Sequence, residues 1–324
     1  MTTLHLNATD LSRTVLRSAP SVLLELGAAG QRLVEATVPE HLTAWQARTR
    51  AALRPRMRPY LDLCRLPGWF PDFLTPPRLG TDLTAALDEV AATPAEALAA
   101  ELRPRIEAGD LPPRVGALAV GEPAARHRLR AAMVAFHEVA VAPYWATITA
   151  AVHADRAVRG HTMVDVGIDR VLRDLSPYLS WTSSGEGYQL SYECGFAHRI
   201  DLTPAGRGVT LVPSYLVPRP CVLDDPAGPL VLAYPVRPTR RELTSGKPLA
   251  DLLGRTRAAV LGAVADGPST SQLARTLGIS VASASQHTTT LRSAGLISTD
   301  RVGSAVRHTL TPLGEHLLRA GRAR

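Results

Sequence analysis

The stretch that decides the fold of the C-terminal quarter of the chain, residues 269–297, reads STSQLARTLGISVASASQHTTTLRSAGLI. Ser269 and Gln272 have the spacing of a capping box, in which each side chain satisfies a free backbone N–H group of the other, and they predict the start of a short helix. Gly278 ends this helix, because only a residue that tolerates the left-handed conformation closes a helix so tightly. The stretch therefore predicts two helices joined by a tight turn.

The second helix, expected from Val281 to Ala294 after the N-cap Ser280, is unusual for a surface helix. Its first turns, VASASQHTTT, contain small and hydroxylic residues and no charge, whereas a solvated helix normally carries Glu and Lys. Such residues let a helix lie close in the major groove of DNA, where Ser, Thr and Gln form hydrogen bonds with base edges. The alternative is a buried, tightly packed helix, in which these Thr and Gln side chains would need internal partners.

The residues on both sides of this stretch complete a winged helix-turn-helix. Upstream, apolar residues from Leu249 to Val264 fall on one face of a helix. Downstream, residues 298–301 and 305–310 read as two strands flanked by arginines, a wing suited to reach phosphates or the minor groove. Thr311 and Pro312 then take the N-cap and first-turn positions of a last helix, whose apolar face is suited to pack against a second copy.

These residues resemble the ArsR-type winged-helix repressors over about the last 75 residues of the chain. The resemblance rests on Leu273-Ala274-x-x-Leu277-Gly278-Ile279-Ser280, Ser283-x-Ser285-x-His287-x-x-x-Leu291-Arg292-x-Ala294-Gly295-Leu296-Ile297, Arg301-x-Gly303 and Leu310-Thr311-Pro312-x-Gly314. It implies a homodimer on a palindromic operator in double-stranded DNA, with base contacts from Ser283, Ser285 and Gln286 and phosphate contacts from the wing. Thr288 departs from the pattern, because the family usually has leucine there.

The residues expected to contact DNA fall into two groups. From the recognition helix and its N-cap we expect Ser280, Val281, Ser283, Ser285, Gln286, Thr289 and Arg292. At phosphates and in the wing we expect Thr270, Arg275, Arg301 and Arg307. Metal sensors of this family use a Cys pair near the DNA-binding helices, or His and Asp on the last helix. This chain has no cysteine after Cys221, so we expect neither a metal nor another cofactor.

The distribution of charge supports a polyanion-binding C-terminal part. The 324-residue chain has 36 basic and 29 acidic residues, a net charge of +7. From Leu249 onward nine arginines face four acids, so this quarter alone carries +5. Neutralisation of phosphates supplies most of the sequence-independent affinity of a protein for DNA. A solvated basic face explains the charge equally well, so charge alone leaves both interpretations open.

The rest of the chain predicts a mainly helical domain with a small antiparallel sheet. Helical spacing of apolar residues, cut by prolines, runs from about Asp10 to Leu175, and β-forming segments follow at 188–192, 208–212 and 229–234. We therefore expect an α+β fold, mainly α. The expected domains are an N-terminal domain for sensing or dimerisation (1–236), a linker (237–248) and a winged helix-turn-helix (249–324).

The N-terminal domain itself is similar to that of actinobacterial ArsR-type regulators, and this similarity adds no chemistry. It rests on Leu172-x-x-Leu175-x-Pro177 and Gly206-x-Gly208-x-x-Leu211-x-Pro213-Ser214. The use of arginine in place of lysine, with Lys247 the one lysine, fits a GC-rich bacterial genome.

Two further groups of residues have alternative interpretations. The first group consists of aromatic residues in the helical block: Trp69, Phe73, Tyr144 and Trp145. They are interpreted either as the lining of an apolar ligand pocket or as part of the hydrophobic core. His161, Asp165 and Asp169 are spaced by four, so on one helix they bind a divalent ion or form an ordinary polar face.

The sequence also indicates several negative expectations. No Gly-x-Ser-x-Gly, Walker loop or His-Glu-x-x-His is present, so we expect no enzyme. No apolar run is long enough to span a membrane, and the N-terminus lacks a secretory signal, so we expect a cytoplasmic, nucleoid-associated protein.

The function expected from these features is that of a dimeric repressor whose N-terminal domain senses a ligand or assembles the protein while the winged helix reads an operator. The alternatives are an architectural DNA-binding protein without a ligand and an enzyme with a fused DNA-binding domain.

Overall fold

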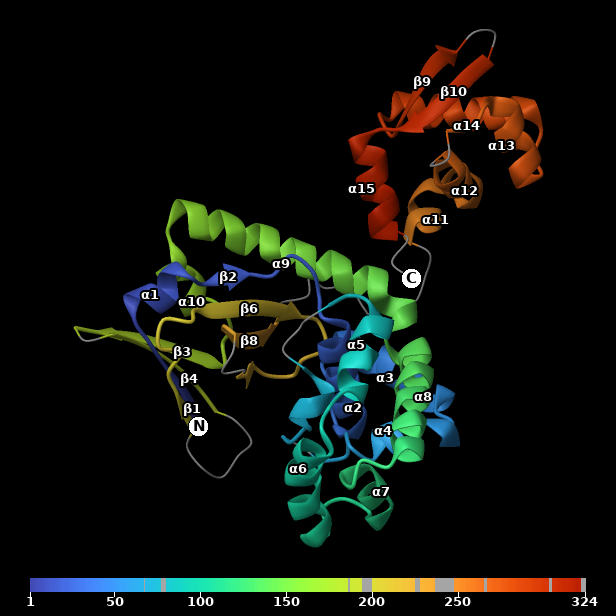
Figure 1. Cartoon of the computed structure of the whole chain (residues 1–324). Coiled ribbons are helices and arrows are strands. Elements are labelled where there is room, and N and C mark those ends of the chain that lie inside the picture. Colours follow the sequence, from blue (N-terminus) through green and yellow to red (C-terminus); the bar gives the residue numbers. More distant parts are fainter. Residues whose placement is uncertain are drawn as a thin grey trace. The chain divides into compact units, whose positions relative to one another are not determined.

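The computed structural model describes residues 1–66, 68–76, 80–185, 187–193, 200–224, 228–236, 248–264, 267–302 and 305–321 (Figure 1). The chain forms two compact units, Met1–Thr244 and Ser245–Arg324, each of which is described here by itself. The division falls within the expected linker 237–248, of which only Pro248 lies among the described residues. The mainly helical α+β fold expected from the sequence is confirmed.

Short helices separated by prolines make up most of the first unit, as the sequence predicts. The helices are α1 (Ala8–Ser12), α2 (Val22–Val34), α3 (Glu40–Ala52), the 3₁₀ helix η1 (Pro55–Met57), α4 (Arg58–Leu61), η2 (Asp72–Leu74), α5 (Leu83–Ala91), α6 (Ala95–Glu107), η3 (Pro113–Val115), α7 (Gly116–Ala119), α8 (Pro123–Ala140), η4 (Ala142–Tyr144), α9 (Trp145–Asp165) and α10 (Ile168–Arg173). Proline opens several of these helices because its fixed φ suits the first turn.

Helix α8 packs against the helices α2, α3, α4, α5 and α7 of this unit. Its residues Leu129, Met133 and Phe136 are buried on one face, in agreement with their helical spacing in the sequence. The indole Nε1 of Trp45 in α3 donates a hydrogen bond to the Ala140 carbonyl at the end of α8, at 2.8 Å. This buried bond joins α3 to α8, because it satisfies the one polar atom of a large apolar side chain.

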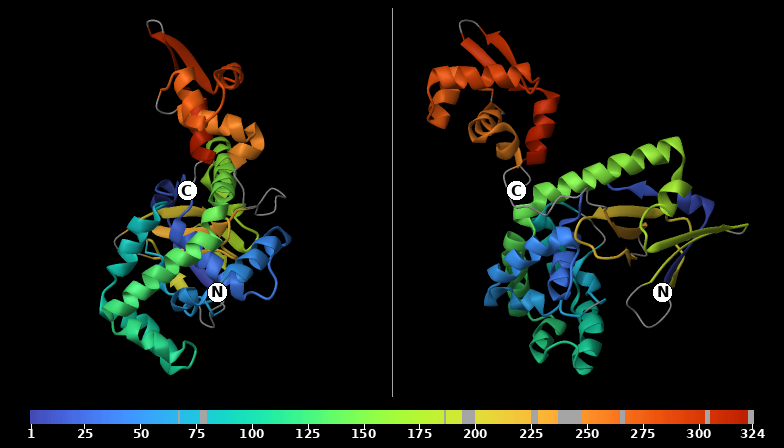
Figure 2. Two further views of the ribbon diagram at one scale, coloured as in Figure 1. Left: turned by 90° about the vertical axis from the view of Figure 1, so that its right-hand side faces the viewer. Right: turned by 180° about the vertical axis from the view of Figure 1, so that it is seen from behind.

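The strands described in the first unit form two four-stranded sheets. One has the order β3 (Leu179–Ser184), β4 (Gly187–Tyr192), β1 (Thr2–Leu6) and β5 (Ile200–Leu202). The other has the order β2 (Val15–Leu16), β6 (Val209–Ser214), β8 (Leu230–Pro235) and β7 (Cys221–Leu223). The long helix α9 lies along the second sheet, as Figure 2 shows, and Tyr234 of β8 donates a hydrogen bond to Asp155 of α9 at 2.7 Å.

The expectation of one small antiparallel sheet is wrong in its pairing, although all three predicted segments are strands. β6 and β8 pair in parallel, with Val209 opposite Leu230, because the chain between them returns through β7, which pairs with β8 antiparallel. β4 belongs to the other sheet, where it pairs with β1, a strand that the sequence did not reveal.

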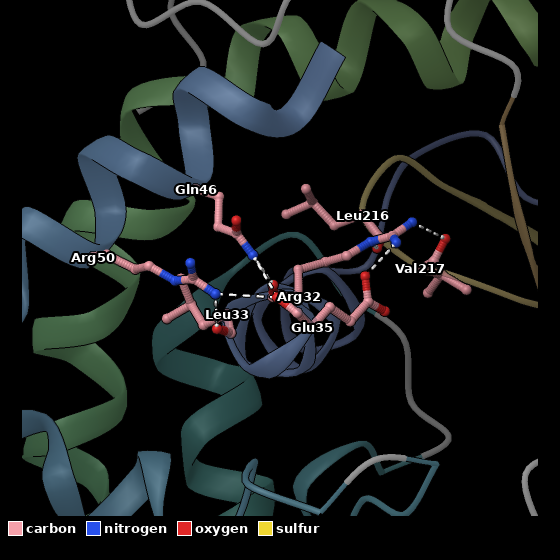
Figure 3. Close-up of polar contacts among 7 residues, drawn as sticks. All are labelled: Arg32, Leu33, Glu35, Gln46, Arg50, Leu216 and Val217. Atoms are coloured by element: carbon pink, nitrogen blue, oxygen red, sulfur yellow. Dashed lines mark hydrogen bonds and ion pairs between the residues drawn. The ribbon is translucent and has the colours of Figure 1, made fainter. Parts of the chain in front are cut away.

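A polar network joins the helical part of this unit to the second sheet. The carboxylate of Glu25 in α2 accepts backbone hydrogen bonds from Tyr215 and Leu216, at 2.8 and 2.9 Å, in the turn that follows β6. About two turns further along α2, Arg32 donates a hydrogen bond to the Leu216 carbonyl at 2.9 Å (Figure 3). The helix thus holds both the N–H and the carbonyl groups of the turn.

The carbonyl groups at the C-terminal end of α2 are satisfied by the neighbouring helix α3. Gln46 donates to the Arg32 carbonyl at 2.7 Å, and Arg50 donates to the Leu33 carbonyl at the same distance (Figure 3). Side chains of α3 therefore cap α2, because the last carbonyls of a helix have no partner within it.

The second unit contains five helices and one hairpin among its described residues. They are α11 (Pro248–Leu253), α12 (Arg255–Ala263), α13 (Thr270–Leu277), α14 (Val281–Ser293), β9 (Ile297–Val302), β10 (Ala305–Leu310) and α15 (Pro312–Gly321). The single helix expected over Leu249–Val264 is wrong, because Gly254 has a φ of 81° and separates α11 from α12. Leu252, expected on the apolar face, is 70% exposed as a result.

Across the described residues of the chain, none of the helices has the length and apolar character needed to cross a membrane.

Candidate DNA-binding surface

The turn between α13 and α14 has the geometry that the sequence predicts. The Ser269 hydroxyl accepts a hydrogen bond from the Gln272 N–H at 3.3 Å, and the Gln272 side chain accepts one from the Ser269 N–H at 2.7 Å. Gly278 is left-handed, with φ 64° and ψ 31°, and the Ile279 N–H donates to the Ala274 carbonyl at 3.0 Å. The predicted capping box and glycine stop are both confirmed, and together they fix where α14 starts.

Helix α14 begins at the predicted N-cap, where the Ser280 side chain accepts from the Ser283 N–H at 3.1 Å. Its buried side is formed by Ala284, Thr288 and Leu291. The buried hydroxyl of Thr288 donates to the Ser285 carbonyl at 3.0 Å, which explains how a threonine replaces the expected leucine without an unsatisfied group.

The opposite side of α14 is exposed and mostly uncharged. Ser283 is half-buried, and the exposed residues are Val281, Ala282, Ser285, Gln286, Thr289, Thr290, Arg292 and Ser293. The alternative of a wholly buried helix is therefore wrong. The structure brings all seven residues expected from the recognition helix and its cap onto this helix, with Ser280 at its exposed N-terminal end.

An open depression lies where α13 meets the N-terminus of α14. It is lined by Ser271, Ala274, Arg275, Gly278, Ile279, Ser280 and Val281. The exposed Arg275 adds a positive charge beside the helix N-terminus, whose free N–H groups and dipole favour an anion. The position suits a phosphate of a duplex that enters against α14.

The wing is the antiparallel pair of β9 and β10, in which Ile297 lies opposite Leu310 and Asp300 opposite Arg307. The Arg307 guanidinium is exposed, and its Nε donates to the Gly267 carbonyl at 3.0 Å. This bond places the predicted phosphate-binding side chain beside the start of α13. The side chain of Arg301 and the predicted turn at Gly303-Ser304 lie outside the described residues.

His308 is the residue of this unit that the sequence analysis missed. It is 3% exposed, and its Nε2 lies 2.9 Å from the Thr270 hydroxyl while its Nδ1 lies 3.0 Å from the Thr299 hydroxyl. Burial lowers the pKa of His308, and the nearby Arg292 lowers it further. The alternation Val306-x-His308-x-Leu310 in a strand was the signal that His308 points inward.

This contact gives Thr270 a partner within the unit, and its phosphate contact stays a prediction. The residue was predicted to contact a phosphate, but it is half-buried and its hydroxyl is in contact with His308. In the described structure it joins α13 to the wing.

The four aromatic residues of the expected ligand pocket lie in different surroundings. Phe73 lines a cavity of about 10 Å³ between α5, α6 and α8, which has room for a single water molecule. Trp69 lies beside Arg105, whose Cζ is 5.2 Å from its ring. Tyr144 and Trp145 are buried at the start of α9.

His161, Asp165 and Asp169, the candidate metal ligands spaced by four, do not lie on one helix. α9 ends at Asp165, and Asp169 lies in α10. Nδ1 of His161 is 2.6 Å from the Ala157 carbonyl oxygen, and Asp169 accepts a hydrogen bond from the Trp181 indole at 2.7 Å. His161 and Asp169 therefore each have a partner within the first unit.

Comparison with known proteins agrees with the geometry of the second unit. Residues 252–300 match a family of helix-turn-helix domains. No curated protein and no solved structure matches the chain. Residues 252–300 are therefore a helix-turn-helix DNA-binding domain. This domain indicates a DNA-binding role for the protein, in transcription regulation.

Proposed function

We propose that the protein is a dimeric repressor of the ArsR type that binds a palindromic operator. The observation that carries the proposal is the exposed face of α14, which presents Ser285, Gln286 and Thr289 and is uncharged except for Arg292 in the last turn. A helix that faces solvent usually carries charged residues. Uncharged side chains that donate and accept hydrogen bonds are instead suited to contact the edges of bases.

In this proposal the arginines around α14 bind the DNA backbone. Arg275 and Arg292 are exposed at the ends of the two helices, and Arg307 is exposed on the wing. A guanidinium forms charge-assisted hydrogen bonds with phosphate, and such contacts fix the position of a protein on a duplex without reading its sequence.

We propose further that the first unit senses a small molecule or assembles the dimer. A signal then acts by changing the separation of the two recognition helices, because they must match half-sites about one helical turn apart. We propose no catalytic activity for this chain.

A mobility-shift experiment on the promoter region of the protein's own gene tests the DNA-binding part. We expect Gln286→Ala to weaken specific binding by about 1–3 kcal/mol and to leave non-specific binding unchanged. We expect Arg275→Ala to weaken binding to all duplexes and to flatten its dependence on salt. Thr256→Ala, at an exposed position of α12, is the matched control.

Two results would count against the proposal. If the protein binds no duplex from this promoter region at low salt, the region contains no operator for it and the proposal fails. Equal, sequence-independent effects of Gln286→Ala and Arg275→Ala, together with a specificity ratio near one, would make the protein an architectural DNA-binding protein instead.

A further inference from the structure

The first unit has its own concentration of positive charge. Residues 48–65, called here the basic segment, contain one acid, Asp62, and six arginines: Arg48, Arg50, Arg54, Arg56, Arg58 and Arg65. The rest of residues 1–248 contains 21 basic and 24 acidic residues. The basic segment thus carries +5, as much as the whole chain from Leu249 onward, and it does so within a unit that is otherwise acidic.

The fold presents this charge to solvent. The segment runs from the end of α3 through η1 into α4 and beyond, beside α8 (Figure 1). Met57, Tyr60 and Cys64 face inward and are buried, and the Tyr60 ring packs on Phe136 of α8 with the ring centres 5.4 Å apart. The six arginines are all exposed. An apolar inner side therefore anchors the segment while the charge stays outside.

The acids described near the segment neutralise little of the charge of Arg56, Arg58 and Arg65. Asp62 accepts two hydrogen bonds from Arg114, at 2.6 and 2.7 Å, so its charge is already balanced by an arginine outside the segment. Arg56 lies 3.8 Å from Glu138, and both side chains are well exposed, so this pair is weak. Among the described residues, Arg58 and Arg65 have no ion-pair partner.

We propose that the basic segment is a second DNA-binding surface, which contacts the phosphate backbone of a duplex. This inference rests on the proposed function, because the helix-turn-helix brings the chain to a duplex. The surface and the DNA backbone are complementary in charge. One guanidinium group can donate two parallel hydrogen bonds to a phosphate, and each such contact releases counterions condensed on the DNA. The surface adds affinity and no sequence preference.

The test compares two charge-matched variants of the full chain. The first is Arg56→Gln, Arg58→Gln and Arg65→Gln together. The control is Arg103→Gln, Arg156→Gln and Arg170→Gln, three exposed arginines on α6, α9 and α10 that remove the same charge. The thermal melting of both is measured first, and we expect it to match the unaltered chain because all six side chains are exposed.

The probes are random-sequence duplexes of about 60 and about 15 base pairs, titrated at salt concentrations from about 50 to 200 mM. We expect the segment variant to bind the long duplex about tenfold more weakly at low salt, with the slope of log K against log salt reduced by about 2 to 3. We expect the control to be unchanged, and the short duplex to be affected less than the long one.

Equal affinities and slopes for the segment variant and the control would overturn the inference. A greater loss for single-stranded RNA of the same length than for the duplex would also overturn it, in favour of an RNA surface. The proposed function is judged separately by Arg275→Ala, which must weaken binding to the short duplex; its failure there counts against the helix-turn-helix assignment rather than against the segment.

Discussion

The hydroxyl of Thr270, the first residue of α13, lies 2.9 Å from Nε2 of His308 in the wing. The backbone strengthens the same connection, since the His308 N–H donates to the Pro268 carbonyl at 3.1 Å. The hairpin is thus fixed to the helix that precedes the recognition helix. A wing held in this way keeps one position relative to α13, which under the proposed function lets the wing and α14 contact one duplex together.

Thr270→Val tests this connection, because it keeps the shape of the side chain and removes the hydroxyl. His308 is buried, so the loss of a partner for Nε2 should cost about 1–3 kcal/mol of unfolding free energy. We expect weaker binding to duplex DNA as well, since the wing is less firmly placed. Urea denaturation and a DNA titration measure the two effects. Thr256→Val, at an exposed site of α12, serves as the control, and equal behaviour of the two variants would contradict the role of Thr270.

The stability of the DNA-binding unit should depend on pH through His308. Its pKa in the folded chain is lowered by burial and by Arg292, so the folded state favours the neutral ring. The stabilisation is complete above the ordinary histidine pKa of about 6.5 and is lost as the pH falls below it. Unfolding free energies at pH 7.5 and 5 measure this, and His308→Gln should show a smaller fall between them. An unchanged fall in that variant would exclude His308 as the cause.

Glu25 should give a pH dependence of the opposite sign in the first unit. Burial raises its pKa to about 7, although hydrogen bonds from Tyr215, Leu216 and Ser214 oppose the shift. Because the folded pKa is raised, the stabilisation is present at pH 4.5 and is lost as the pH rises through about 7. The charged and titratable groups near this turn include Tyr215, Arg32 with its ion-pair partner Glu35, and His41.

The measurement for Glu25 is the unfolding free energy of the unaltered chain minus that of Glu25→Gln. We expect this difference to fall between pH 5 and pH 8, by an amount on the order of 1–3 kcal/mol. His41→Gln is the control, since the pKa of His41 is lowered by burial and by Arg32, and its titration runs in the other direction. A difference that rises with pH would be incompatible with a buried, protonatable Glu25.

Gly278→Ala should destabilise the helix-turn-helix. The residue has a φ of 64°, a conformation that costs a residue with a side chain about 1–2 kcal/mol. Gly116→Ala is a close control, because Gly116 lies in α7 and an added methyl group there meets nothing within 4 Å. It should be neutral or slightly stabilising. If both changes have the same effect on thermal unfolding, the stability of the helix-turn-helix does not depend on a left-handed residue at position 278.

The features that the sequence predicted are those set by neighbours in the chain. The caps at Ser269 and Ser280, the glycine stop at Gly278 and the inner face of α8 all depend on residues a few positions apart, and each was found where expected. The break at Gly254 was missed because the apolar spacing continues across it, and only the backbone angle reveals two helices.

The features that the sequence did not reveal depend on distant residues. The parallel pairing of β6 and β8 requires β7 to lie on the far side of β8, which no local pattern encodes. In the same way, β1 joins a sheet whose other strands lie more than 170 residues further along the chain. His308 contacts Thr270 across 38 positions, so its role became visible only in the folded unit.

The hydrogen bonds between α2 and the turn after β6 link the helical part of the first unit to its second sheet. Glu25 accepts hydrogen bonds from the N–H groups of Tyr215 and Leu216, and Arg32 donates one to the carbonyl of Leu216, so this turn cannot separate from α2 without breaking three buried hydrogen bonds. We therefore expect the helical part and the sheet to open together. The amide hydrogens of Tyr215 and Leu216 then exchange with solvent at the rate of α2, and a disturbance of either part reaches the other.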